Sequence, residues 1–273
     1  MVRRLERSGT VTTIASFPTT EPQHMTAFAV SPDGGTIMAT VLTFGRIGPG
    51  LPGAITIGPS YNNLEIATAG GPATVLSHAP QNTTRPGQFA VAGWDQGGPL
   101  AGAIATTTQN ALPEGWGIPL FHLGLDGNSH EHLGGVGRVA EVEAAGGQVL
   151  CSTSAFAAAP VQVRTSAGAV TWSLPAAVHS WSSVALSPSG NAVAADPGAF
   201  TGTASNGNKV YFRDGAVAGI PADFYSAGWW DDQTVVGYSG VDRSTLATIT
   251  LSDHQPGAVH KLNKSLYAGR IDP

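Results

Sequence analysis

The sequence predicts an all-β fold assembled from one repeated four-stranded unit, and three observations support this prediction. A hairpin of two apolar strands around a polar turn recurs five times along the chain. A second type of hairpin, with a Gly-containing turn, alternates with it. No segment shows a convincing 3.6-residue helical period, and helix-forming residues other than Ala are scarce. A four-stranded unit that recurs at roughly 40–50 residues has the spacing of a propeller blade, so we predict a β-propeller.

The first type of hairpin combines small apolar strands with a turn that contains Gly, Asp or Gln. Small side chains suit the crowded centre of a propeller, so we expect these hairpins to form the two innermost strands of each blade. They span Ala27–Leu42, Gln88–Ala105, Arg138–Ser154, Ser182–Asp196 and Phe224–Ser239.

The second type of hairpin turns at Gly, usually after Asp, Ser, Ala or Gly, which is a strong short-range hairpin signal. We expect these hairpins to form the outer two strands of each blade. They span Val2–Ser16, Leu64–His78, Pro119–Gly134, Val161–Pro175, Lys209–Pro221 and Thr245–Leu262, the last with its turn expected around Pro256 and Gly257.

The two types differ in number, since Val2–Ser16 has no first-type partner beside it. We expect the C-terminal segment Leu266–Pro273 to supply an inner strand there. The sequence therefore predicts one domain over residues 1–273 with six four-stranded antiparallel blades, the sixth composite. A five-bladed ring and a truncated seven-bladed ring are the alternatives. Closure of the ring removes free sheet edges.

The turns carry a more specific resemblance. Phe28–Ala39 reads FAVSPDGGTIMA and resembles the Ser-Pro-Asp-Gly turn of WD40-like and TolB-type β-propellers. Val184–Ala195 is a second copy, with Ser189 in place of Asp, and the AGWDQGG and AGWWDDQ segments resemble a Trp-containing variant. Ser and Asp hydrogen-bond the turn backbone, Pro presets φ, and Gly accepts a positive φ. The resemblance covers nearly the whole chain and implies a fold rather than an activity.

Composition and charge exclude some partners. Charged residues make up only 11% of the chain, and the net charge is −5. The basic residues form no stripe, with one cluster at Arg3, Arg4 and Arg7, so we expect no nucleic-acid partner. No apolar run reaches the length of about 18 residues that a membrane-spanning helix needs. We expect a monomer with no membrane span in this chain.

The N-terminus lacks the apolar core of a signal peptide. The first residues already resemble the middle of a sheet, so we expect an extracytoplasmic domain, secreted or on the cell surface, of a longer chain. A cytoplasmic location is the alternative. The single cysteine, Cys151, lies in an apolar strand, and we interpret it as a small buried residue rather than a nucleophile.

The predicted core lies on the innermost strands, where alternate residues face inward. Trp181, Trp229 and Trp230 are expected to pack between blades. The expected core residues are Phe28, Val30, Phe89, Val91, Ala140, Val142, Val184, Leu186 and Tyr225.

Three long loops are candidate ligand-binding segments, because they exceed the usual hairpin length. They are Phe44–Tyr61, Gln109–Gly117 and Gly198–Asn208. Polar or aromatic side chains that would contact a ligand there are Arg46, Glu114 and Trp116. Packing of the loop on itself is an equally supported interpretation for Trp116.

A second group of candidates precedes the first-type hairpins, at what would be the mouth of the central channel. Such residues would suit a carboxylate, a phosphate or a metal, although capping of short loops is the favoured interpretation. They are His24, Arg85, His179 and Asp223.

A metal site is considered at His130 and His132, which alternate in a strand and so share a face. Zinc requires three or four ligands, and this pair supplies two. The favoured interpretation is a polar edge strand that prevents aggregation. We expect no cofactor.

No catalytic signature is complete. The segment Gly237–Val241 lacks the second Gly of a nucleophile elbow, and no metalloprotease, Walker or dinucleotide motif occurs. We therefore expect a non-catalytic binding or scaffold domain that recognises a protein, peptide or cell-envelope ligand through one face. The alternatives are a lactonase- or glycosidase-like propeller hydrolase with its site at the channel mouth, and the sensor ectodomain of a larger membrane protein.

Overall fold

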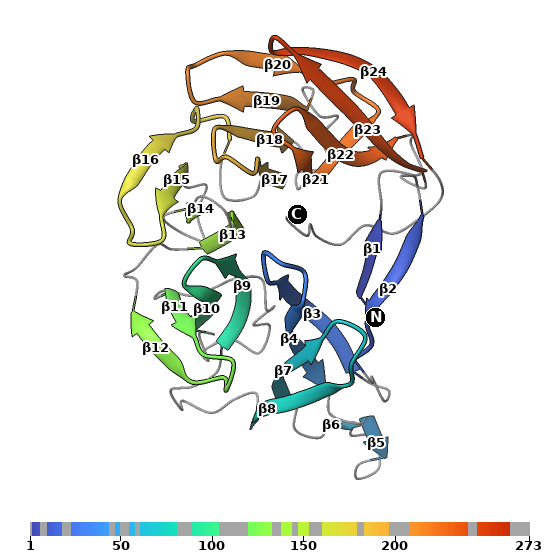
Figure 1. Ribbon diagram of the computed structural model, residues 1–273, viewed down its shortest axis with the longest axis vertical. Helices are drawn as coiled ribbons and strands as arrows, with labels where there is room; N and C mark the ends of the chain where they lie inside the picture. Colours follow the sequence, from blue (N-terminus) through green and yellow to red (C-terminus); the bar gives the residue numbers. More distant parts are fainter. Residues whose placement is uncertain are drawn as a thin grey trace.

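The computed structural model describes the parts of the chain that form its strands and tight turns. Within them all regular structure is β, and five four-stranded antiparallel sheets surround a common centre (Figure 1). This confirms the predicted all-β architecture of four-stranded blades. The described residues are 2–5, 10–17, 23–43, 47–49, 55–57, 61–80, 89–103, 120–132, 138–143, 147–152, 160–178, 183–196, 208–239 and 245–262.

The five sheets, which we call blades 1 to 5, each run outward from the centre in chain order. Blade 1 consists of β3 (Gln23–Val30), β4 (Thr36–Thr43), β7 (Tyr61–Thr68) and β8 (Ala73–Pro80). Blade 2 consists of β9 (Phe89–Asp95), β10 (Gly98–Ala103), β11 (Leu120–Leu123) and β12 (Ser129–His132). Blade 3 consists of β13 (Arg138–Glu143), β14 (Gln148–Ser152), β15 (Val161–Thr165) and β16 (Val170–Ser173).

The remaining strands complete the ring. Blade 4 consists of β17 (Ser183–Leu186), β18 (Ala192–Asp196), β19 (Lys209–Phe212) and β20 (Val217–Gly219). Blade 5 consists of β21 (Phe224–Asp231), β22 (Thr234–Ser239), β23 (Thr245–Ser252) and β24 (Gln255–Lys261). Two short sheets pair β1 (Val2–Leu5) with β2 (Val11–Ala15) and β5 (Ile47–Pro49) with β6 (Ile55–Ile57).

The predicted alternation of hairpins is confirmed, because first-type hairpins form the inner pair of strands and second-type hairpins the outer pair in all five blades. The β1–β2 sheet lies between blade 5 and blade 1 (Figure 1). It contacts blade 1 through a hydrogen bond from Gly70 N–H to the Ile14 carbonyl, at 2.9 Å. The predicted inner strand at Leu266–Pro273 lies outside the described residues, so the count of six blades stays a prediction.

The Ser-Pro-Asp-Gly turn of blade 1 has the predicted hydrogen bonds. Ser31 Oγ accepts the N–H of Thr36 at 2.8 Å and donates to Asp33 Oδ1 at 2.5 Å. Asp33 Oδ1 also accepts the N–H of Gly35 at 2.9 Å. Gly34 has a φ of 71°, the left-handed conformation that favours Gly. The local chemistry of the sequence therefore determines this turn.

The second copy, in blade 4, has the same geometry. Ser187 Oγ accepts the N–H of Ala192 at 3.0 Å, and Gly190 has a φ of 69°. Ser189 takes the place of Asp and accepts the N–H of Asn191 through its Oγ, at 3.3 Å. The hydroxyl thus substitutes for the carboxylate as the acceptor in this turn.

The expected turn around Pro256 and Gly257 is wrong. The β23–β24 hairpin turns at Asp253 and His254, whose φ values are 48° and 62°. A two-residue hairpin loop needs positive φ at both positions to match the strand twist, and Asp tolerates this conformation. Pro256 lies on the edge strand β24, where a missing N–H is tolerated.

The core lies mainly on the second strands rather than on the innermost ones. Every residue of β18 is buried, because that strand has neighbours on both sides within its sheet and blades on both faces. The innermost strand of each blade has a neighbouring strand on one side only, and Phe28, Val184 and Tyr225 are only partly buried. Of the other predicted core residues, the structure buries Val30, Val91 and Leu186, and the side chains of Phe89, Ala140 and Val142 lie outside the described part.

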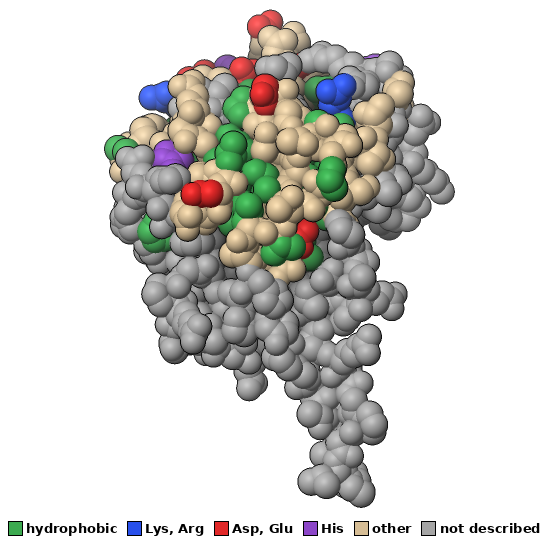
Figure 2. Space-filling model, turned by 60° about the horizontal axis from the view of Figure 1, so that its bottom comes forward, with side chains coloured by type: hydrophobic (Ala, Val, Ile, Leu, Met, Phe, Trp, Pro, Cys, Tyr) green, Lys and Arg blue, Asp and Glu red, His purple; other side chains and the backbone are tan. Residues whose placement is uncertain are grey.

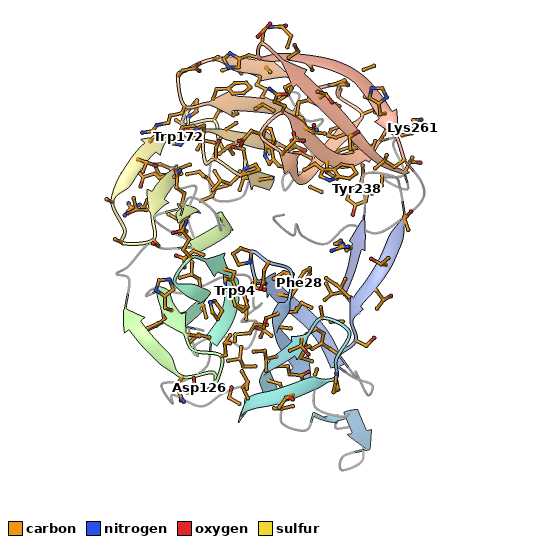
Figure 3. All side chains as sticks on the ribbon, viewed as in Figure 1. Phe28, Trp94, Asp126, Trp172, Tyr238 and Lys261 are labelled. Carbon is orange, nitrogen blue, oxygen red and sulfur yellow. The ribbon has the colours of Figure 1, made fainter. Side chains whose placement is uncertain are left out.

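Tryptophan side chains join blades as predicted at one position. Trp229 is 1% exposed, and its Nε1–H donates to the Ala185 carbonyl of blade 4 at 3.0 Å. Trp230 is partly buried, and Trp181 lies outside the described residues. Phe28 and Trp94 lie toward the centre of the ring, whereas Asp126 and Lys261 lie at its outer margin (Figure 3). No helix among the described residues is long and apolar enough to cross a membrane.

Candidate functional site

A pocket of about 420 Å³ opens where blades 4 and 5 meet. In an antiparallel blade the two hairpin turns lie at the same end, and this pocket lies at that end. Each blade supplies half of the lining residues. Blade 4 contributes Ser187, Ser189, Asn191, Ala192 and Phe212, and blade 5 contributes Asp232, Gln233, Leu251, Asp253 and His254.

The inner turns of the two blades are tied together at the pocket. Asp232, in the β21–β22 turn, accepts the N–H of Ser189 through its Oδ1 at 2.8 Å. The Ser189 carbonyl in turn accepts Gln148 Nε2 of blade 3 at 3.0 Å. Ser189 is therefore held from both sides, and the pocket wall is fixed before any ligand arrives.

The outer turn of blade 5 crosses to blade 4 through His254. Its ring packs on the ring of Phe212, with centroids 4.0 Å apart and planes inclined at 36°. His254 Nε2 lies 3.8 Å from Asp214 Oδ2, so the two groups form an ion pair when the imidazole is protonated. The imidazole is 43% exposed and the carboxylate 62% exposed. The His254 side chain thus closes the outer side of the junction while it stays accessible to a ligand.

A second polar feature lies within blade 2. His122 Nε2 lies 2.8 Å from Asp95 Oδ1, with the side chains 12% and 4% exposed. Asp95 Oδ1 also accepts the N–H of Gly97 at 2.7 Å. The corresponding third-strand positions in the other blades hold Ile66, Val163, Val210 and Thr248. The pair therefore stands where three of the other blades have an apolar side chain, and it joins the inner turn of blade 2 to its third strand.

Burial makes Cys151 a poor nucleophile. Its side chain is fully buried on β14, and that burial raises the pKa of the thiol to about 11. We expect the native thiol to react with Ellman's reagent at about pH 8 at least ~100-fold more slowly than the unfolded protein does. A stopped-flow or manual time course with and without guanidinium measures this. Rapid labelling of the native protein would contradict the burial.

Glu65, on β7, is a buried carboxyl. It is 4% exposed and accepts Asn63 Nδ2 at 3.3 Å, and burial raises its pKa above the usual range. Because the pKa of Glu65 is higher in the folded state than in the unfolded state, the folded protein favours the neutral carboxyl. The free energy of unfolding therefore falls as the pH rises above the unfolded-state pKa and the carboxyl ionises. We expect Glu65→Gln to raise the free energy of unfolding by about 1 kcal/mol near neutral pH.

The pH dependence of this variant separates charge from packing. Below about pH 3 the carboxyl is neutral in both states, so Glu65→Gln and the parent should unfold at the same temperature. Thermal melts followed by circular dichroism across this range measure the difference. A variant that is less stable than the parent at neutral pH would show that the ionised carboxylate stabilises the fold.

Of the ligand-binding candidates from the sequence, only the side chain of Asp223 lies in the described part of the structure. Asp223 is exposed beside the start of β21, at the end of the blade opposite the pocket. His24 lies in β3 and His130 and His132 in β12, but their side chains lie outside the described part. The remaining candidates lie outside the described residues: Arg46, Arg85, Glu114, Trp116 and His179.

The long loops and the metal hypothesis have different outcomes. Part of the loop Phe44–Tyr61 forms the β5–β6 hairpin, whereas Gln109–Gly117 and, apart from Asn208, Gly198–Asn208 lie outside the described residues. Within the described part of the chain, no three His, Cys, Asp or Glu side chains are grouped so as to hold a metal ion. The described residues therefore offer no complete ligand set.

Sequence reasoning missed the pocket because its residues come from turns that had been interpreted as structural. One local feature of the sequence could have drawn attention to the pocket. Asp253 and His254 occupy turn positions for which Asn-Gly is the usual choice.

Comparisons with solved structures agree with this architecture. The tricorn protease matches with a TM-score of 0.56 and 14% identity over 97% of this chain and 24% of that one. The fold is a β-propeller. TolB from Acinetobacter baumannii has a TM-score of 0.46 and 12% identity over 89% of this chain and 56% of that one. The Cps50 (Swd1) β-propeller domain of Myceliophteria thermophila has a TM-score of 0.43 and 11% identity over 84% of this chain and 66% of that one.

The likeness to the tricorn protease shows the fold alone. The chain spans between 24% and 66% of the length of these three structures. No protein-family model matches the sequence, and no curated protein matches it.

Proposed function

We propose that this propeller is a non-catalytic binding domain that recognises a protein, peptide or cell-envelope ligand through the end of the ring that carries the tight turns. The observation that supports the proposal is the pocket of about 420 Å³ between blades 4 and 5. Its walls belong to two blades already joined by the Ser189–Asp232 and Trp229–Ala185 hydrogen bonds. A preformed pocket of this kind binds without paying to order its walls.

The charged side chains of the described residues are sparse on the surface and form no extended patch of one sign. Among the residues coloured in Figure 2, charged side chains stand apart among uncharged ones, and acidic groups are more frequent than basic ones. This distribution agrees with the net charge of −5 and 11% charged residues. Recognition would therefore depend on a local site rather than on a long-range field.

An array experiment tests this proposal. Labelled protein is applied to peptide and glycan arrays together with two variants, Asp232→Asn at the pocket and Asp223→Asn at the opposite end of the ring. The Asn side chain at 232 still offers an oxygen to the Ser189 N–H, so the fold should be kept. We expect binding to at least one class of probe by the parent and by Asp223→Asn, and a signal at least ~10-fold lower for Asp232→Asn.

The array also tests the alternatives. Binding that is lost in Asp223→Asn and kept in Asp232→Asn would move the site to the other end of the ring. Turnover of a lactone or of a nitrophenyl glycoside, with no binder on either array, would favour the hydrolase. We also propose that the domain acts outside the cytoplasm and as a monomer, and light scattering after size-exclusion chromatography tests the monomer.

A further inference from the structure

The pocket between blades 4 and 5 combines negative charge with an apolar floor. Its ten lining residues include two Asp, one His and no Lys or Arg. Ala192 and Leu251 are buried and Phe212 is partly buried, so the floor is apolar. An aliphatic chain that ends in a positive charge matches this pattern, because the chain packs on the floor while its charged end reaches the carboxylates.

The two carboxylates that line the pocket both belong to turns of blade 5. Asp232 uses one oxygen for the Ser189 N–H, and a carboxylate has further lone pairs to offer. Asp253 has no hydrogen-bond or ion-pair partner within the described part of the chain, and its side chain is exposed. The side-chain amides of Asn191 and Gln233 add oxygen acceptors at the rim. Several acceptors therefore line one pocket, where a donor-rich group would lie.

The turn at Asp253 and His254 has an unusual pair of residues for its backbone conformation. Both residues have positive φ, whereas the other positive-φ residues among the described ones are all Gly. A two-residue hairpin loop of this kind favours Asn-Gly, which would form the same turn with less strain. Both side chains line the pocket.

From these observations we infer that the pocket between blades 4 and 5 binds the guanidinium or ammonium group of an Arg or Lys side chain presented by a peptide segment of a partner. The inference rests on the proposed binding function and specifies its ligand. Asp232 and Asp253 pair with the cation, Asn191 and Gln233 accept its remaining N–H groups, and Leu251 and Phe212 contact the aliphatic stem. His254 holds the outer turn of blade 5 against Phe212, which keeps Asp253 at the rim.

Four end-capped heptapeptides test the inference. Each has the sequence Gly-Ser-Gly-X-Gly-Ser-Gly, where X is Arg, Lys, citrulline or norleucine. Citrulline keeps the shape of Arg without the charge, and norleucine keeps an aliphatic chain without an amine. Titration into isotope-labelled protein, followed by NMR chemical shifts, gives each dissociation constant. We expect the Arg and Lys peptides to bind at least ~10-fold more tightly than the citrulline and norleucine peptides. The two uncharged side chains cannot form charged hydrogen bonds with the carboxylates of the pocket.

Three variants assign that preference to the pocket. Asp232→Asn should weaken binding of the Arg peptide at least ~10-fold without a change in fold. The double variant Asp253→Asn with His254→Gly should raise the melting temperature, because it relieves the strained turn, and should still bind at least ~10-fold more weakly. Asp33→Asn is the matched control, since Asp33 is an exposed turn Asp in blade 1, outside the pocket. It should bind like the parent.

The results separate this inference from the function on which it rests. Equal binding of the Arg and citrulline peptides would overturn the cationic ligand. If array ligands that depend on Asp232 are uncharged saccharides, the proposed binding function stands and the cationic ligand is wrong. If array ligands are independent of Asp232, and no heptapeptide shifts the resonances of the pocket, both are wrong.

Discussion

Replacing Trp229 with Ala is expected to lower the free energy of unfolding by about 3–5 kcal/mol, which is the range for removal of a fully buried aromatic side chain. Trp229 is 1% exposed and packs in the core cluster that joins blades 4 and 5. Its Nε1–H donates to the Ala185 carbonyl at 3.0 Å, so the substitution also removes a buried hydrogen bond between the two blades. Equilibrium unfolding in guanidinium measures the loss.

Two further variants separate the contribution of the Trp229 hydrogen bond from that of its buried ring and provide a surface control. Trp229→Phe keeps an aromatic ring but removes the N–H, and it should cost about 0.5–1.5 kcal/mol for the lost hydrogen bond. Val217→Ala is the surface control, because Val217 is 49% exposed on β20, and it should stay within about 0.5 kcal/mol of the parent. If Trp229→Ala costs no more than the Val217 control, Trp229 does not join the two blades.

Replacing Gly237 with Ala is expected to lower the free energy of unfolding by about 3 kcal/mol or more, as much as Trp229→Ala. The added methyl group would meet the backbone, which cannot move aside easily. Gly237 lies in the middle of β22, opposite Ser226. A Cβ at this position would overlap the Tyr225 carbonyl oxygen and lie 2.7 Å from the ring of the fully buried Phe224. Neither neighbour can move without opening the β21–β22 ladder. Thermal unfolding and the soluble yield both report the effect.

A second glycine provides the control for this substitution. At Gly219, on β20, an added Cβ would have no heavy atom within 4 Å. Gly219→Ala should therefore be neutral or slightly stabilising, because Ala restricts the unfolded chain more than Gly does. Equal behaviour of the two variants would mean that β21 and β22 pack differently from the structure described above.

Local patterns were sufficient to predict the strands and most of their turns. Alternating apolar residues and Gly-containing turns predicted the inner and outer pairs of all five blades, because both signals act within a few residues. Ser31 and Ser187 then form the expected hydrogen bonds, since turn chemistry is also local. The turn at Asp253 and His254 was missed because Pro256 and Gly257, two residues later, are the stronger local signal.

Burial and the pocket depend on how blades meet, and no local pattern reports that. The four-residue apolar run of β18 is buried on both faces because blades pack on each side of it, whereas β21 alternates. The pocket joins Ser189 to Asp232, which are 43 residues apart in the chain. Sequence reasoning placed the candidate ligand contacts in long loops and before the first strands, whereas the pocket lies at the ends of tight turns.

The most direct test of binding through this pocket is hydrogen–deuterium exchange of the parent protein with and without the Arg heptapeptide. Binding at the junction of blades 4 and 5 predicts slower exchange in the β17–β18, β21–β22 and β23–β24 turns. Exchange in the β3–β4 turn, which includes Asp33, should be unchanged. Two results would contradict binding at this junction. One is protection confined to the β20–β21 connection around Asp223, at the other end of the ring, and the other is protection at no turn of blades 4 and 5.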